Sequence, residues 1–198
     1  MYEYRNLTPQ QRKELVQQRL CLGFPAHSPP HLIRDENFYL LTAACYEHEH
    51  HMELQSRRQQ LLNKIFEQFI LNGLEISAWS ILPNHYHLLV YVSNFDLLSN
   101  IFRLVHGSTS YQWNKEDKVR NRKVWYSYSD RAIRSERHYY TTLNYIHYNA
   151  VKHDWVKSPY EWSECSVSWY LENYGRQWLR DSWVYYPVKD FGDAWDNF

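Results

Sequence analysis

The sequence lacks a disulfide framework, a zinc knuckle and a membrane span. Its three cysteines, Cys21, Cys45 and Cys165, are far apart and form no Cys-x-x-Cys pair. Such sparse cysteines are typical of a protein kept in a reducing compartment. No apolar run approaches the roughly 18 residues of a membrane-spanning helix, and the polar N-terminus has no signal-peptide core. We therefore expect a cytoplasmic protein.

An excess of charge of either sign is also missing. Lysine and arginine number 22, as do aspartate and glutamate, so the formal net charge is zero. Nucleic-acid-binding proteins usually carry a basic excess, so composition alone argues weakly against that class. Aromatic residues, in contrast, make up 18% of the chain. Most belong in a core, but the number is large enough that some must lie on surfaces, where they can stack on a base.

Hydrophobic periodicity predicts alternating strands and helices. A helix begins at Thr8, where Gln11 completes a capping box. Further helices are expected over 56–73, 94–117 and 135–153, and strands over 37–47, 74–82, 85–92 and within 120–137. In the helix over 94–117, the apolar spacing predicts an inner stripe of Leu97, Leu98, Ile101 and Leu104.

This order of elements predicts an α+β fold of the ferredoxin-like kind, with helices packed on an antiparallel sheet. The stretch GFPAHSPPHL interrupts the periodicity after the first helix. We expect an N-terminal helical extension and connector over 1–26, a main domain over 27–160, and a C-terminal extension over 161–198. The extension is rich in tryptophan and is expected to wrap the main domain in short pieces.

The stretch LPNHYHLLVYV, residues 82–92, carries two histidines on one side of a predicted strand. Side chains alternate along a strand, so His85 and His87 face one way while Tyr86, Leu88 and Val90 face the other. Two neighbouring imidazoles can hold a metal, bind a phosphate, or form hydrogen bonds within a packed layer. The histidine pair alone does not distinguish these three roles.

The last predicted main-domain helix offers partners for this pair. Tyr145 and Asn149 are four residues apart and share a face. If the helix crosses the sheet face that presents His85 and His87, a phenol, an amide and two imidazoles converge. Imidazole and oxygen ligands with open positions suit Mg²⁺ or Mn²⁺ better than a closed structural zinc site. A phosphodiester polarised there could be attacked by the phenolate of Tyr145.

The segment 120–137 is both basic and aromatic. It is either an exposed charged strand and loop, or a surface whose cations contact phosphates while Trp125 or Tyr126 stacks on an unpaired base. Lys152 and His153, just after Asn149, are placed to hold the scissile strand or its leaving oxygen, and His153 could relay a proton. The expected DNA-contacting residues are Arg120, Arg122, Lys123, Trp125, Arg131, Arg134, Lys152 and His153.

Two alternative assignments stay open. Tyr148 is the leading rival to Tyr145 as a nucleophile, although helical spacing turns it away from the stripe of Asn149. The histidine-rich stretch EHEHHM, residues 47–52, is a second candidate metal site, for which a solvated loop is the simpler interpretation.

Several spaced motifs resemble one known family. The stretches ACYEHEHHM, WSILPNHYHLLV, DRAIRSERHYYTTLNYIHYNAVKHDWV and EWSECS are similar, in this order, to motifs of the REP-associated tyrosine transposases, a family of single-tyrosine HUH nucleases. The resemblance extends from about His27 to the end. It implies a monomeric, cytoplasmic DNA endonuclease and strand transferase that acts on hairpin-forming single-stranded DNA with Mg²⁺ or Mn²⁺.

The resemblance also implies roles for individual residues. Tyr145 falls on the nucleophile that forms a 5′-phosphotyrosine, and His85, His87 and Asn149 fall on the metal ligands. Two positions depart from the family pattern, because Ala150 and Asp154 replace its proline and glycine. These departures keep a second function class open, a non-catalytic single-stranded nucleic-acid-binding module. A third is a metallohydrolase that activates water with the histidine pair.

Overall fold

The computed structural model describes residues 8–11, 13–14, 17 and 37–192. Its contacts divide the chain into a unit over Met1–Ile33 and a unit over Arg34–Phe198. In the first unit the predicted capping box is confirmed, because the backbone N–H of Gln11 donates to Thr8 Oγ1 at 3.3 Å and that of Thr8 donates to Gln11 Oε1 at 2.9 Å. The predicted boundary between 1–26 and 27–160 lies outside the described residues.

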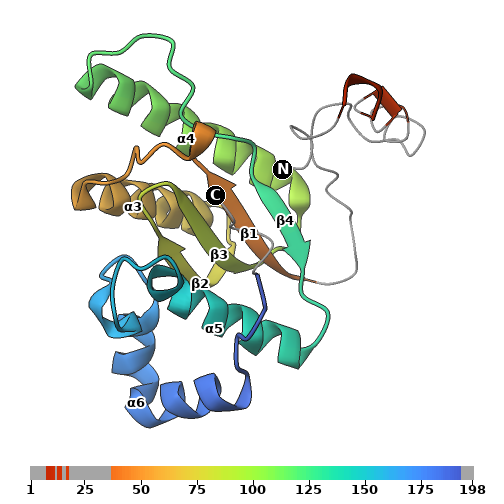
Figure 1. The fold of residues 1–198 in the computed structure, drawn as a ribbon, viewed down its shortest axis with the longest axis vertical. Helices are drawn as coiled ribbons and strands as arrows, with labels where there is room; N and C mark the ends of the chain where they lie inside the picture. Colours follow the sequence, from red (N-terminus) through yellow and green to blue (C-terminus); the bar gives the residue numbers. More distant parts are fainter. Residues whose placement is uncertain (1–7, 12, 15–16, 18–36, 193–198) are drawn as a thin grey trace. The chain divides into compact units, whose positions relative to one another are not determined.

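Within residues 37–192, four strands form one antiparallel sheet in the order β2-β3-β1-β4 (Figure 1). In chain order the elements are β1 (Phe38–Ala44), the 3₁₀ helix η1 (Tyr46–His48), α3 (Gln55–Leu71), β2 (Glu75–Ile81), β3 (His85–Tyr91), α4 (Phe95–Glu116), β4 (Ser129–Ala132), α5 (Glu136–Lys152), the 3₁₀ helix η2 (Pro159–Glu161) and α6 (Val167–Tyr185). This strand order with its crossover helices is ferredoxin-like. The predicted fold class is confirmed.

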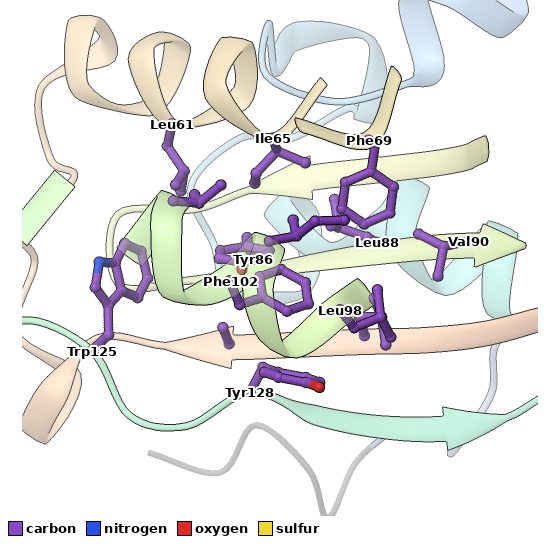
Figure 2. Packing of buried hydrophobic residues seen from close by; sticks show 14 of the residues in the cluster. Leu61, Ile65, Phe69, Tyr86, Leu88, Val90, Leu98, Phe102, Trp125 and Tyr128 are labelled. Atoms are coloured by element: carbon purple, nitrogen blue, oxygen red, sulfur yellow. The ribbon is translucent and has the colours of Figure 1, made fainter. Parts of the chain in front are cut away.

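Strand alternation separates two layers of packing. On one face, Tyr86, Leu88 and Val90 of β3 pack into an apolar core under α3 and α4 (Figure 2). On the opposite face, α5 packs against β2 and β3, and α6 packs against α5. The second layer is apolar at Leu89 and Leu143, but it also receives the histidines of β3. The side of the sheet that α5 covers is therefore where polar chemistry is buried.

The structure corrects one predicted helix face. In α4 the predicted stripe is right at Leu98 and Ile101, but Leu104 is 47% exposed. The buried stripe continues through Phe102 and Val105 instead. Leu97 is partly buried against this core, whereas Leu104 lies on the flank of the helix, away from the centre of the buried stripe.

The described part of the C-terminal tail consists of short helical pieces, because α6 is made of two helices that meet at a kink (Figure 1). α6 runs from Val167 to Tyr185 and bends at Gly175, whose φ of 83° is left-handed. Tyr170, Tyr174 and Trp178 form a ring cluster across the bend, with centroids 5.1 to 5.6 Å apart. These ring contacts pack the two helices of α6 against each other across the kink.

The described part of the chain contains no helix with the length and apolar character needed to cross a bilayer.

Candidate active site

The two histidines of the predicted motif lie side by side in the middle of the sheet. β3 is an inner strand, flanked by β2 and β1, and His85 and His87 occupy its face toward α5. Their ring centroids are 5.1 Å apart and their side chains are 1% and 0% exposed. The predicted common orientation is confirmed, and it brings both imidazoles into a dry environment.

His85 is held in one tautomer by its neighbour in the turn. Its Nδ1 lies 2.8 Å from Asn84 Oδ1. Because an amide oxygen only accepts, Nδ1 must carry the hydrogen and Nε2 keeps its lone pair. Burial lowers the pKa of His85 well below its usual value, and His87, His153 and His48 lower it further. The neutral ring therefore presents a nitrogen that can bind a metal.

His87 connects the sheet to the tyrosine of α5. Its Nδ1 lies 2.7 Å from the hydroxyl of Thr42, its cross-strand neighbour on β1. Its Nε2 lies 3.2 Å from Tyr145 Oη, and the two rings meet edge to face with centroids 5.1 Å apart. The phenol of α5 thus reaches the histidine pair of β3.

Asn149, one turn after Tyr145, is wholly buried in the same place. Its amide interacts with the His85 ring and favours the protonated form, although burial outweighs this effect on the pKa. Within the described residues, neither its oxygen nor its nitrogen forms a hydrogen bond of ordinary geometry. A buried amide without such bonds is costly to folding. A bound ligand at this position would offset that cost.

These donors fit the divalent cation that the sequence implies. Two imidazole nitrogens and one amide oxygen leave several positions open, which suits Mg²⁺ or Mn²⁺ in contact with a phosphate. Among the described residues no group of three His, Cys, Asp or Glu side chains could hold a metal, so the third protein ligand here would be Asn149.

The alternative metal site over residues 47–52 has a different structure. Its first residues belong to η1, and the rings of His50 and Trp155 meet with centroids 5.5 Å apart.

A cover over Tyr145 was not anticipated from the sequence. The tyrosine is 0% exposed because the segment after α6 runs back along α5 (Figure 1). A Cβ on Gly192 would lie 2.5 Å from Tyr145 Cε2, so the backbone touches the ring. Lys152 Nζ donates to the Gly192 carbonyl at 2.9 Å and lies 5.2 Å from the Tyr145 ring centroid. A lone glycine in an aromatic tail has no sequence signal that would reveal this contact.

Tyr148, the rival nucleophile, has different surroundings. Its ring packs edge to face against Trp183 with centroids 5.0 Å apart. Burial raises its pKa, and Tyr160 raises it further. A raised pKa disfavours the phenolate, so this environment works against a nucleophilic role.

Arg131 and Arg134 gather positive charge near the start of α5. Burial and then Arg134 lower the pKa of Arg131, and burial followed by the two arginines lowers that of His138. The backbone N–H of Arg134 donates to His138 Nδ1 at 3.2 Å. Like charges held this close favour an anion such as a phosphate.

Other predicted DNA-contacting residues differ in their availability. Arg120 is exposed, and Lys123 Nζ lies over the rings of Tyr46 and Tyr126 at 4.6 and 5.4 Å. Arg122 instead forms an ion pair with Asp117 at 2.7 Å. Its guanidinium is thus already engaged within the protein.

The prediction that Trp125 stacks on an unpaired base does not agree with its position. Trp125 is 6% exposed and lies in the core under α4 (Figure 2). Its ring stacks on His106 at 4.5 Å, and its Nε1–H donates to Thr109 Oγ1 at 3.0 Å. Both the ring face and the polar edge are already used. Tyr126, the alternative, is half-buried beside Lys123.

Residues after Asn149 remain close to the histidines despite the two departures from the family pattern. α5 continues through Ala150 to Lys152, and Asp154 takes the left-handed conformation with φ 57° that the missing glycine would favour. His153 directly follows α5, and its ring centroid is 4.9 Å from that of His85. Burial lowers the pKa of His153 to about 4, with His87 and Lys152 adding to the effect.

Comparison with known proteins agrees with the motif resemblance. No protein-family model matches the chain. The REP-associated tyrosine transposase of Escherichia coli K12 is 27% identical, in a match that covers 56% of this chain and 70% of that protein. A solved structure of a REP-associated tyrosine transposase bound to a REP hairpin has a TM-score of 0.59 and 22% identity, and covers 74% of this chain and 86% of that one. The structural match concerns the fold. Together the two comparisons confirm the predicted resemblance.

Proposed function

We propose, on the premise that this chain resembles the REP-associated tyrosine transposases, that it cleaves and joins hairpin-forming single-stranded DNA through a covalent link to Tyr145. A transposase-like role in DNA processing is the coarser statement, which the curated relative supports. The finer statement concerns the nucleophile, the metal and the substrate. It depends mainly on one observation, the hydroxyl of Tyr145 at 3.2 Å from His87 Nε2 beside the buried amide of Asn149.

In this proposal Tyr145 attacks a phosphodiester in line. Its Oη forms a bond to phosphorus while the bond to O3′ breaks, which leaves a 5′-phosphotyrosine and a free 3′-hydroxyl. The phenol proton leaves to solvent and O3′ takes a proton from water, with His153 next to His85 as a candidate relay. His85, His87 and Asn149 would hold Mg²⁺ or Mn²⁺, whose Lewis acidity stabilises charge on the phosphate.

Lys152 and the arginines near the start of α5 would position the strand. Lys152 Nζ is 5.2 Å from the Tyr145 ring centroid, so a phosphate beside the nucleophile would be within its reach. Arg131 and Arg134 would supply a second cationic point just before the N-terminus of α5, whereas Lys152 is its last residue. A hairpin partner is consistent with the solved neighbour, which is bound to a REP hairpin.

One observation favours the non-catalytic alternative. Tyr145 is 0% exposed beneath Gly192, so no phosphate can reach it while the C-terminal segment stays in place. A chain that keeps this cover closed could bind nucleic acid without cutting it.

A single assay separates the two functions. The full chain is incubated with Mn²⁺ and hairpin oligonucleotides that carry randomised single-stranded flanks, and the products are resolved under denaturing conditions. We expect a protein–DNA band that survives denaturant, requires the cation and is missing in Tyr145→Phe. Hairpin binding without such a band in the wild type would support the binding module. Cleaved DNA with no covalent band would point to a metallohydrolase.

A further inference from the structure

A pocket of about 310 Å³ lies next to Tyr145 but apart from the histidine pair. It lies between α5 on one side and the end of α6 with the segment that follows it on the other. Tyr145, Tyr148 and Lys152 line it from α5, and Trp183, Val188 and Lys189 line it from the C-terminal side. None of its lining residues is a histidine, so it is a separate feature that shares one wall, Tyr145, with the candidate active site.

The chemistry of this pocket suits a flat, uncharged ring attached to a phosphate. The rings of Tyr148 and Trp183 meet at an angle of 77° and form an aromatic corner. The remaining lining is mainly apolar, no acidic side chain contributes to it, and Lys152 and Lys189 supply two exposed cations. Aromatic surface combined with cations is how proteins bind single-stranded nucleic acid.

The pocket has little capacity to read the edge of a base. Its only amide side chain, Asn144, is already engaged with the C-terminal end of α6. Asn144 Nδ2 donates to the carbonyls of Ser182 and Tyr186 at 2.8 and 2.9 Å, and its Oδ1 accepts from Ser182 Oγ at 2.9 Å. Recognition here would therefore depend on stacking and shape, which tolerate different bases. A volume at the low end of ligand-pocket sizes allows one base rather than several.

We propose that this pocket takes one unpaired nucleobase of the strand that Tyr145 attacks, stacked on Trp183 or Tyr148. The inference rests on the proposed function and adds a subsite to it. Lys152 and Tyr145 both line the pocket, and Lys152 Nζ is 5.2 Å from the Tyr145 ring centroid, so the phosphate of the stacked nucleotide passes its ammonium group. That phosphate replaces the Gly192 carbonyl to which Lys152 Nζ now donates. Filling the pocket thereby orients the neighbouring phosphate toward Tyr145 Oη.

The test uses the full chain as Tyr145→Phe, so that no cleavage takes place, labelled with 5-fluorotryptophan. Fluorine NMR follows each tryptophan during titration with single-stranded tetranucleotides of thymidine or of deoxyadenosine, and with an abasic tetranucleotide of equal charge. Trp183→Phe assigns the Trp183 signal, and Trp169, exposed on the same helix, serves as the matched reference. We expect both base-containing oligonucleotides to shift the Trp183 signal, the abasic one to leave it unchanged, and none to shift Trp169.

A pocket-filling variant gives a second measurement. Val188→Trp should reduce the affinity for the base-containing tetranucleotide about tenfold, to that of the abasic one, with thermal melting as a check on folding. An equal response of Trp183 to abasic and base-containing DNA would overturn the inference. The adduct assay on the wild type is separate. Adducts without a base-dependent shift of the Trp183 signal would support the proposed function and contradict the base subsite. A base-dependent shift without adducts would support the base subsite and contradict the proposed covalent chemistry.

Discussion

Two histidine–tyrosine hydrogen bonds involve neighbouring residues of β3 on opposite faces of the sheet. Tyr86 Oη lies 2.8 Å from His106 Nε2 under α4, and Tyr145 Oη lies 3.2 Å from His87 Nε2 under α5. Tyr86, His87 and Tyr145 are buried, and His106 is half-buried. The first is surrounded by rings, among them Phe102 and Trp125. The second adjoins another imidazole, that of His85, and the amide of Asn149.

This difference shows that a histidine–tyrosine pair is not a site by itself. Burial raises the pKa of Tyr86 well above its usual value and lowers that of His106 to about 3, so the core pair stays neutral at any working pH. On the other face, the neighbours of Tyr145 are groups that could bind a cation and a phosphate. The surroundings of each pair, rather than the pair itself, suggest its role.

The largest expected effect comes from removing each tyrosine hydroxyl in turn. Tyr145→Phe should lower the yield of covalent DNA adducts by more than ~10³-fold, since it removes the proposed nucleophile. Tyr86→Phe should leave adduct formation intact but destabilise the fold by about 1–3 kcal/mol, because His106 loses its partner. Denaturing gels and urea denaturation measure the two effects. Equal adduct yields from Tyr145→Phe and wild type would remove the distinction between the faces.

Loss of the groups that orient the histidines should have an intermediate effect. Asn84→Ala and Thr42→Val remove the partners of His85 Nδ1 and His87 Nδ1, so each should raise the Mn²⁺ concentration needed for half-maximal cleavage by about 10–100-fold. His106→Gln in the other pair is the matched control and should leave this concentration unchanged. The same Mn²⁺ dependence in Asn84→Ala as in wild type would argue against His85 as a ligand.

The neutral core histidines should make the fold sensitive to acid. Burial lowers the pKa of both His106 and His147 to about 3. The unfolded chain therefore binds more protons than the folded one from about pH 6.5 down to pH 3, and stability falls as pH falls through this window, by on the order of 1 kcal/mol per pH unit for each histidine. Urea midpoints at pH 7, 6 and 5 measure the slope. It should be shallower in His106→Gln, and an unchanged slope would exclude His106 as a cause.

The smallest expected effect concerns the cover over Tyr145. Gly192 and Gly73 both have left-handed backbones, with φ of 85° and 65°, but only a Cβ on Gly192 would meet the tyrosine ring. Each change to alanine should destabilise the fold by about 1 kcal/mol through backbone strain. Only Gly192→Ala should also increase nitration of Tyr145 by tetranitromethane, as measured by mass spectrometry. Equal nitration in the two variants would mean that Gly192 does not shield the ring.

Much of the fold was predictable because local patterns and tertiary packing agree. The alternation in LPNHYHLLVYV placed Tyr86 and Leu88 on one face and the histidines on the other, as found. The spacing of Tyr145 and Asn149 likewise placed both on the buried side of α5. These positions follow from the periods of strand and helix, which the sequence displays directly.

The remaining features depend on contacts between distant segments. Trp125 lies in a basic, aromatic stretch typical of a nucleic-acid surface, yet its ring fills the space beside His106. Leu104 fits the helical period of α4 but is exposed, because the buried stripe runs through Phe102 and Val105 instead. The contact of Gly192 with Tyr145 joins residues 47 positions apart. Single-sequence periodicity carries no information on such pairings.

Peptide mapping of the covalent product tests the central claim most directly. After reaction with the hairpin oligonucleotides and Mn²⁺, the denatured adduct is digested with nuclease and protease, and the modified tyrosine is located by tandem mass spectrometry. The account predicts a nucleotide attached through its 5′-phosphate to Tyr145. A nucleotide attached to Tyr148 or to any other tyrosine would contradict it.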